Sequence, residues 1–223
     1  MTFYVERDIR TLLNVKDLAQ FQLFVKMCAS RTGQLLNLSA LAADCGITHN
    51  TAKAWIGVLE TSGIVYVMHP YYRNYGKRLV KSPKLHFLDP GLVCRLLGIR
   101  DREQLFINPL RGNIFESFIV SELLKHRLNA GLPADLYSWA DNIKTEVDAL
   151  IEDGSRIAAI EIKSGQTILP EFFNGLKNWI KYSGSPAKDC YLVYAGNIQV
   201  TQQDMHIISW DRTAEIECLT PMN

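Results

Sequence analysis

Acidic residues and a lysine recur at alternate positions on either side of an Asp-Gly pair. Glu146 and Asp148 lie two residues apart before Asp153-Gly154, and Glu161 and Lys163 lie two residues apart after it. Alternate residues of a β-strand point to the same face of a sheet. Asp-Gly between two alternating runs is a strong signal for a hairpin turn. The sequence therefore predicts a β-hairpin that gathers three acids and one lysine.

The apolar residues of this hairpin determine which face carries the charges. A register that pairs Val147 near Ile160 brings the apolar residues of both strands to one face, because a one-residue slip would bury the wrong set. The charged residues then share the opposite face with Leu150 and Ala159. We therefore expect the charges to lie in partly buried surroundings, not simply in solvent.

The chemistry of such a group follows from its charges. Three carboxylates at short range repel one another, and burial raises the pKa of each unless a cation joins them. Their oxygens are hard ligands that suit Mg²⁺ or Mn²⁺, and such an ion stabilises charge on a phosphate and lowers the pKa of a bound water. A lysine on the same face can orient or deprotonate that water, or offset charge on the phosphate. The set favours phosphodiester hydrolysis.

A fourth acid comes from a helix predicted upstream of the hairpin. Residues 113–128 carry apolar side chains at helical spacing. Glu116 lies one turn before Ile119 and Val120, so its carboxylate lies on the stripe that otherwise points inward. Glu122 points about a third of a turn away and is predicted to be a surface charge. Glu116 is thus the fourth candidate for the same site.

The first part of the chain predicts a helical module followed by two strands. Helices are expected over residues 18–30, 38–46 and 50–59, with Ser39 as a candidate N-cap and Gly46 as a stop signal. Strands are expected over residues 64–68 and 85–88, and a short helix follows them. Three helices and a hairpin in this order are typical of a winged helix. The third helix offers His49, Asn50 and Lys53 as candidate DNA contacts.

The loop between the two strands, residues 71–84, is cationic. It holds three tyrosines, no acid, and the cations Arg73, Lys77, Arg78, Lys81 and Lys84. Cations and aromatic rings in a protruding loop suit phosphate contact and base stacking. We predict DNA binding through the first four of these cations. The alternative, which the sequence leaves open, is a solvated wing that packs on a neighbouring domain.

Composition limits the classes of protein that fit. A chain of 223 residues with formal charge +1 suits one large or two small domains, and it can bind nucleic acid only through a local patch. No apolar run reaches membrane-spanning length, and the five cysteines are scattered as packed thiols would be, which indicates a cytoplasmic protein. The chain has no P-loop motif, so we expect that it does not bind ATP.

The acidic motifs together resemble a known superfamily. Gly112-x-x-Phe115-Glu116, Glu146-Val-Asp148 and Glu161-Ile-Lys163 are similar to the motifs of the PD-(D/E)xK, or restriction-endonuclease-like, superfamily. The resemblance implies an α/β domain with a mixed sheet flanked by helices. It also implies that Asp148 and Glu161 are metal ligands, Lys163 the catalytic lysine and Glu116 an auxiliary metal ligand. Val147 stands where the superfamily is named for a proline.

The wider chain resembles the C-terminal portion of bacterial and archaeal AAA-type ATPases that carry a C-terminal domain of unknown function. The segments that carry this resemblance are Tyr4-Val-Glu-Arg-Asp8, residues 48–63, Lys77-Arg78-x-x-Lys81-x-Pro83-Lys84 and Phe87-x-Asp89-x-Gly91-Leu92. It implies that residues 1–14 end an ATPase lid, 15–104 form a winged helix and 105–223 form the nuclease-like domain. The implied partners are DNA and an ATPase domain absent from this chain, and the oligomeric state stays open.

Two functions remain in view from the sequence. One is metal-dependent hydrolysis of DNA, with Lys163 positioning the attacking water. The other is an inactive module that lets an ATPase recognise DNA or a partner protein without chemistry. Whether the chain is an enzyme therefore depends on the acidic residues, and the basic loop bears only on its partner.

Overall fold

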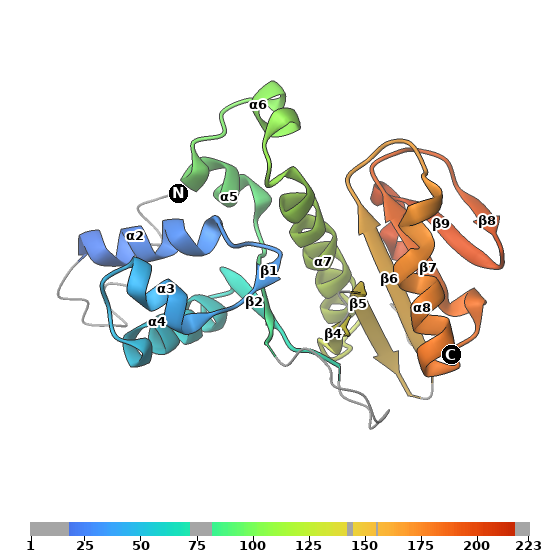
Figure 1. Ribbon diagram of the computed structural model, residues 1–223, viewed down its shortest axis with the longest axis horizontal. Helices are drawn as coiled ribbons and strands as arrows, with labels where there is room; N and C mark the ends of the chain where they lie inside the picture. Colours follow the sequence, from blue (N-terminus) through green and yellow to red (C-terminus); the bar gives the residue numbers. More distant parts are fainter. Residues whose placement is uncertain (1–17, 72–81, 142–144, 155, 217–223) are drawn as a thin grey trace.

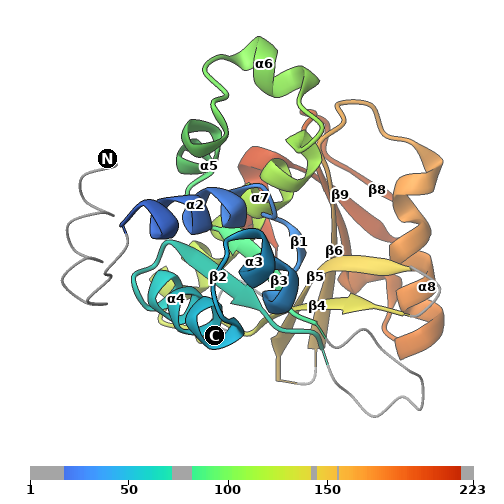
Figure 2. The ribbon, with the colours of Figure 1, turned by 60° about the vertical axis from the view of Figure 1, so that its left-hand side comes forward.

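The computed structural model describes residues 18–71, 82–141, 145–154 and 156–216 of the chain. The protein is a mixed α/β structure with a three-stranded sheet and a six-stranded sheet (Figure 1). We call residues 18–71 and 82–107 the helical part, and residues 111–216, within the described ranges, the sheet part. The two parts lie side by side in Figures 1 and 2, and Figure 1 shows α7 (Arg111–Asn129), the first helix of the sheet part, on the side next to the helical part.

The helical part contains the three predicted helices and both predicted strands. Its elements are α2 (Leu18–Ala29), β1 (Gln34–Leu35), α3 (Leu38–Asp44), α4 (His49–Thr61), β2 (Val65–Met68), β3 (Lys84–Phe87), α5 (Pro90–Leu97) and α6 (Arg102–Ile107). The three strands are antiparallel in the order β1-β3-β2. Phe21, Phe24 and Trp55 pack edge to face between α2 and α4. The strand β1 and the helix α6 had not been predicted.

The caps of these helices correct one prediction. Asn37, not Ser39, begins α3, because the Asn37 side chain accepts a hydrogen bond of 3.0 Å from the Ala40 amide. Thr48 begins α4 in the same way, through a bond of 3.1 Å from the Thr51 amide. Gly46 has a φ of +64° beyond the end of α3, which is the left-handed conformation expected of a glycine stop signal.

The sheet part is built around six strands in the order β4-β5-β6-β7-β9-β8. They are β4 (Leu136–Ala140), β5 (Glu146–Asp153), β6 (Arg156–Lys163), β7 (Cys190–Tyr194), β8 (Val200–Gln202) and β9 (Met205–Ser209). β6, β7 and β9 run parallel, and the remaining pairs are antiparallel. A 3₁₀ turn (Pro170–Phe173) leads into α8 (Asn174–Ser183). Two more 3₁₀ segments span Ala187–Asp189 and Trp210–Glu215.

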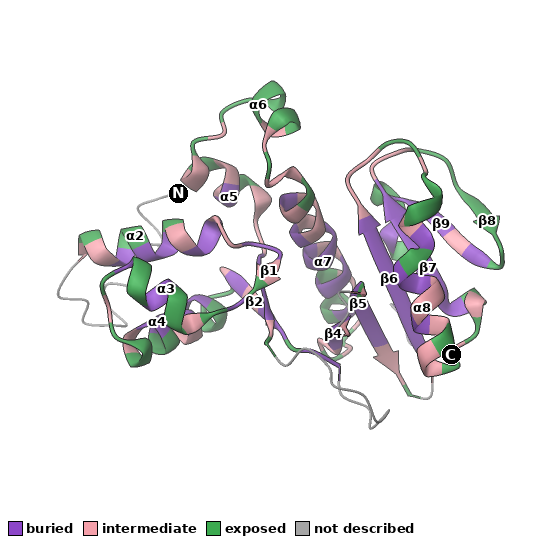
Figure 3. Cartoon of the chain, in the orientation of Figure 1, coloured by how far each residue is buried: buried purple, intermediate pink, exposed green. Residues whose placement is uncertain are grey.

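Both faces of the sheet are covered, as Figure 3 shows by the buried colour of the central strands. On one face, Ala149 and Ile160 pack in a cluster with Ile119 and Leu123 of α7. On the other face, Trp179 of α8 is buried in a second cluster with Leu150 and Ala159 of the sheet. Charged groups on this second face therefore lie at the border of a core. Among the described residues, no helix is both long and apolar enough to cross a membrane.

The register of the β5–β6 hairpin differs from the predicted one by two residues. Ile160 pairs with Ala149, not with Val147, because Asp153 and Arg156 form the closing pair of the hairpin. A shift of two residues by itself keeps each side chain on its predicted face, since the side-chain period of a strand is two. Ala149 and Ile151 do share a cluster with Ala158, Ile160 and Ile162 as predicted, but Val147 lies in the cluster of the opposite face with Leu150 and Ala159. An irregularity in the pairing of β5 with β4 between Val147 and Leu150 causes this change of face, so the prediction was wrong in register and wrong for Val147.

The helical part is attached to the edge strand of the large sheet. Pro70 forms a parallel bridge with Ser138 of β4, and the Tyr71 amide donates a 2.7 Å hydrogen bond to the Ser138 carbonyl. The hydroxyl of Tyr66 donates to the carbonyl of Leu136, 3.1 Å away. Backbone and side-chain bonds therefore fix the outgoing end of β2 to β4.

Candidate functional site

The charged ends of β5 and β6 lie where the two strands part. Their pairing runs from Asp153 opposite Arg156 to Ala149 opposite Ile160. Beyond that point β5 and β6 no longer pair with each other, although β5 remains paired with β4 and β6 with β7. The backbone thus leaves space between the two strand ends, and side chains fill it. The predicted hairpin acids come from these two ends.

Asp148 takes up part of this space and replaces a missing ladder bond. Its Oδ2 accepts a 2.8 Å hydrogen bond from the amide of Ile162 on the opposite strand. The same oxygen lies 3.7 Å from the Nζ of Lys163. Asp148 is only 3% exposed, so its charge depends on these protein partners and not on water.

Glu161 and Lys163 form a close ion pair on β6. The ammonium of Lys163 lies 2.5 Å from Oε1 of Glu161. The other oxygen, Oε2, is buried and has no hydrogen-bond partner among the described residues. A buried carboxylate oxygen without a partner costs free energy. Oε2 of Glu161 is therefore free to accept a proton or bind a cation.

Helix α8 packs against Glu161 and Glu146, and Gly175 is the residue of α8 that lies next to both. A methyl group on Gly175 would lie 2.7 Å from Oε2 of Glu161 and 2.3 Å from the backbone oxygen of Glu146. Both distances are shorter than real Cβ contacts, and the backbone oxygen cannot swing away as a side chain could. The absence of a side chain at Gly175 is what lets α8 approach the acids this closely.

Lys84 of β3 joins the acids from the helical part. Its Nζ lies 3.0 Å from Glu116 Oε1, 3.5 Å from Glu146 Oε2 and 3.7 Å from Asp148 Oδ1. Lys84 was expected among the cations of the loop and not in the site. The available signal was its position directly before the strand predicted over residues 85–88, since β3 begins at Lys84. Glu116 of α7 meets the group through its contact with Lys84.

We call these six residues the acidic site: Lys84, Glu116, Glu146, Asp148, Glu161 and Lys163. Four carboxylates face two ammonium groups, which leaves a formal excess of two negative charges when all are ionised. Burial and repulsion by Asp148 raise the pKa of Glu116 to about 8, although Lys84 acts in the opposite direction. Burial and Asp148 also raise the pKa of Glu161 to about 8, against the effect of Lys163. The raised pKa of both acids means that the acidic site binds a proton or another cation more readily than solvent-exposed carboxylates would.

The two lysines respond to the same field. Burial lowers the pKa of Lys84, but the carboxylates of Glu116, Asp148 and Glu146 more than offset it, so the pKa lies above its ordinary value. The pKa of Lys163 is also raised, because Asp148 and Glu161 outweigh the effect of burial. Both side chains are therefore ammonium ions that serve as charge partners. Neither is poised as a neutral base in this arrangement.

The acidic site suits a divalent cation in the type of its oxygens more than in their arrangement. Hard carboxylate oxygens and the unpartnered Oε2 of Glu161 fit Mg²⁺ or Mn²⁺. Within the described ranges, however, no three His, Cys, Asp or Glu residues are grouped so as to hold a metal ion. Asp148 and Glu161 are the residues that would hold a metal, while Glu116 is engaged by Lys84.

The predicted DNA contacts lie apart from the acidic site in the structure, or beyond its described residues. His49, Asn50 and Lys53 are exposed on the first turns of α4. The loop cations Arg73, Lys77, Arg78 and Lys81 fall outside the described residues, as does the predicted lid segment 1–14.

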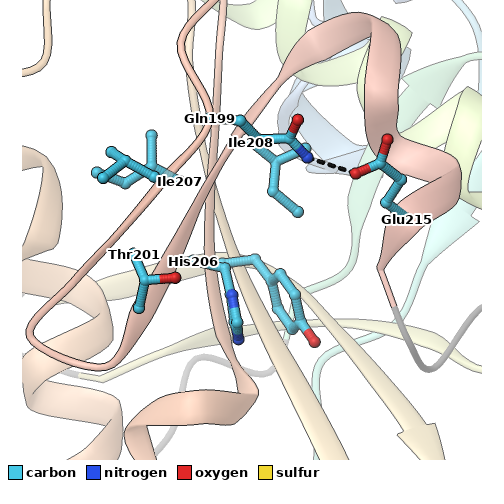
Figure 4. Close-up of a pocket in the computed structure, with 8 residues that line it drawn as sticks. Gln199, Thr201, His206, Ile207, Ile208 and Glu215 are labelled. Carbon is cyan, nitrogen blue, oxygen red and sulfur yellow. Dashed lines mark hydrogen bonds between the residues drawn. The ribbon is translucent and has the colours of Figure 1, made fainter.

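A separate pocket of about 350 Å³ lies beside β8 and β9. Figure 4 shows His206 and Glu215 on its wall, with a hydrogen bond from Gln199 to Glu215. The rings of Tyr191 and His206 stack at 5.1 Å between centroids. None of the residues predicted to do chemistry lines this pocket. It is therefore distinct from the acidic site.

Comparison with known proteins gives two domain matches and longer relatives. Proteins described as “Uncharacterized protein Rv2008c” of Mycobacterium tuberculosis and “Uncharacterized protein Mb2031c” of Mycobacterium bovis are each 33% identical over 169 residues. That alignment takes in 75% of this chain and 37% of each relative, so the chain spans well under half of their length. No solved structure matches the chain. Residues 2–103 match a Domain of unknown function (DUF8612), and residues 111–212 match a second Domain of unknown function (DUF4143).

Proposed function

We propose that the acidic site hydrolyses DNA phosphodiesters with the help of Mg²⁺ or Mn²⁺. The observation that carries the proposal is the meeting of Asp148, Glu161 and Lys163 between the parting ends of β5 and β6. The excess of negative charge there favours a divalent cation, which would stabilise charge on the reacting phosphate. Asp148 and the unpartnered oxygen of Glu161 would hold it.

The protein residues have separate tasks in this reaction. The ammonium of Lys163, 30% exposed, would orient the attacking water and offset charge on the phosphate. The water oxygen bonds to phosphorus and releases a proton to solvent, while the bond to the leaving sugar oxygen breaks and that oxygen takes up a proton. Glu116 supports the site from α7, where it lies within reach of the field of Asp148.

The fold that we propose for the two parts is a winged helix followed by a restriction-endonuclease-like domain. The order of α2, α3, α4 and the antiparallel pair β2–β3 supports the first assignment. An antiparallel hairpin continued by the parallel strands β7 and β9, with a helix on each face, supports the second. Exposed His49, Asn50 and Lys53 support contact of α4 with DNA.

We also propose that this chain corresponds to the C-terminal portion of an AAA-type ATPase. The resemblance of its motifs to such proteins supports this, and so does the greater length of the mycobacterial relatives. On this proposal an ATPase domain is a partner, and the basic loop contacts either DNA or that domain.

Cleavage of DNA by the purified chain tests the enzymatic proposal. Plasmid and branched DNA are incubated with Mg²⁺ or Mn²⁺ and with wild type, Asp148→Asn, Lys163→Met or Glu116→Gln. The first two variants are expected to lose at least a hundredfold in rate, since each removes a group at the reacting centre. The matched control is Glu122→Gln, which alters an acid on the same helix as Glu116 that pairs with Lys125 at the surface. Equal cleavage by all variants would place the activity elsewhere.

A second function is favoured by the three ion pairs of Lys84. They neutralise the acids between the two parts of the chain, as a structural link would. In that case the chain is an inactive module that binds DNA or a protein for the ATPase. DNA binding would then be salt-dependent, independent of metal, and lost when Arg73, Lys77, Arg78 and Lys81 are neutralised together. Fluorescence anisotropy with and without EDTA separates the two functions.

A further inference from the structure

Lys84 brings one ammonium group to three carboxylates of the sheet part. Those carboxylates belong to Glu116 on α7 and to Glu146 and Asp148 on β5, at 3.0, 3.5 and 3.7 Å from Nζ. The side chain of Lys84 is only 7% exposed, so it is held by these partners and not by water. One cation from the helical part therefore lies among acids of two other elements.

The arrangement of the acids fits an ammonium ion better than a metal ion. Over the described residues no group of three potential ligands is ready to coordinate a metal. Glu116 and Asp148 instead face Lys84, which supplies positive charge to carboxylate oxygens of the kind that a hard cation binds. A single ammonium carries half the charge of Mg²⁺ or Mn²⁺ and leaves the site with an excess of negative charge. A divalent cation that replaced it would neutralise more of the acids.

We propose that Lys84 is an internal cation that holds the place of the divalent metal, and that Mg²⁺ or Mn²⁺ enters the acidic site by displacing it. The inference rests on the proposed function, because Asp148, one of the two acids assigned to the metal, is also a partner of Lys84. It adds that the helical part controls metal entry. Lys84 is then a positioning residue that sets the affinity of the site for metal.

The structure has space next to Lys84 into which its side chain could move on displacement. A cavity of about 40 Å³ borders it, lined also by Ser82, Pro70 and Glu146. Glu146 has a side chain that is 52% exposed, so this side of the site opens to solvent. Only the lysine side chain has to move, because other bonds hold the two parts together. One of them joins Thr32 to Ser117 at 2.8 Å.

Binding of Mn²⁺, measured by the electron paramagnetic resonance signal of the free ion, tests the inference without an activity assay. The full chain is compared with Lys84→Met, which keeps an unbranched side chain one atom shorter and removes its charge, and with Lys84→Arg, which keeps the charge. We expect Lys84→Met to bind Mn²⁺ at least tenfold more tightly than wild type, and Lys84→Arg to gain no affinity. Adding Asp148→Asn is expected to abolish binding in every background.

The outcomes separate this inference from the proposed function. If wild type binds Mn²⁺ through Asp148 and Lys84→Met binds equally or more weakly, the metal site stands and the displacement of Lys84 is refuted. If neither wild type nor Lys84→Met binds Mn²⁺, both proposals fail. Tight binding by Lys84→Met with none by wild type would show that the lysine excludes the ion instead of yielding to it, which refutes displacement and metal-dependent hydrolysis by the wild-type chain.

A measurement on the wild-type chain covers the case in which Lys84→Met does not fold. Lysines are acetylated with acetic anhydride with and without Mg²⁺ or Mn²⁺ at constant ionic strength, and the peptides are quantified by mass spectrometry. Displacement predicts a severalfold rise in labelling of Lys84 with divalent cation and none with added NaCl. The exposed Lys53 is the matched control and should not change. Unchanged labelling of Lys84 would overturn the inference.

Discussion

Replacing Gly175 with alanine is a direct test of the packing around the acidic site. In an open helix, Gly→Ala stabilises a protein by about 0.5–1 kcal/mol, because alanine loses less backbone freedom on folding. At Gly175 the new methyl group would lie 2.3 Å from the Glu146 carbonyl oxygen and 2.7 Å from Oε2 of Glu161. Relief requires α8 or β5 to shift, and such overpacking costs roughly 1–3 kcal/mol. The cost should outweigh the gain.

Gly57 of α4 provides the matched control for this substitution. It is also helical, and an added Cβ there would meet no atom within 4 Å. Gly57→Ala should therefore raise the melting temperature by about 2–4 °C for a chain of this size, whereas Gly175→Ala should lower it by a similar or larger amount. Thermal unfolding followed by circular dichroism, with urea titration as a second measure, gives both values. A Gly175→Ala variant as stable as Gly57→Ala would refute the close approach of α8.

Three further predictions concern caps and buried polar groups. Asn37→Ala should destabilise the chain by about 1 kcal/mol and Ser39→Ala by less than about 0.5 kcal/mol, measured by urea unfolding, because Asn37 caps α3. Ser117→Ala should cost roughly 1–3 kcal/mol in the same assay, since it removes the partner of Thr32 at 2.8 Å and of the His86 ring at 3.1 Å. Burial lowers the pKa of His86 to about 3 in the folded chain, with a smaller effect of Lys84. In the unfolded chain the pKa is about 6.5, so between these two values the unfolded chain binds a proton at His86 and the folded chain does not. The free energy of unfolding should therefore be highest above about pH 6.5 and should fall as the pH drops towards 3, by about 2 kcal/mol at pH 5. In His86→Gln this part of the pH dependence should be lost.

Strand alternation explains why the charged residues of the hairpin could be predicted. The period of two places Glu146 and Asp148 on one side of their strand, and Glu161 and Lys163 on one side of theirs. An even shift of register leaves both pairs together, whereas the irregularity of β5 that separates Val147 from Ala149 left no sign in the alternating pattern. The inward stripe of α7 located Glu116 in the same way, since helical spacing is also a local property.

The position of Lys84 could not be predicted by such local rules. It meets Glu116 and Asp148 only because the helical part packs against α7 and β5, and no periodicity records which surfaces of two modules will meet. Short elements were missed for a related reason. β1 has two residues and β8 three, too few to show an alternating pattern, and both form only beside a longer neighbour.

The bridge between Pro70 and Ser138 has a consequence for attempts to express the two matched domains separately. It covers β4, which would otherwise end the large sheet with unpaired backbone groups. Met68 and Tyr71, which precede the expected boundary near residue 104, are buried in the hydrophobic clusters on the two faces of that sheet. A fragment that starts after residue 104 would lack Met68 and Tyr71 from these clusters, and β4 would become an edge strand with unpaired backbone groups. We therefore expect the fragment to aggregate under conditions in which the whole chain does not.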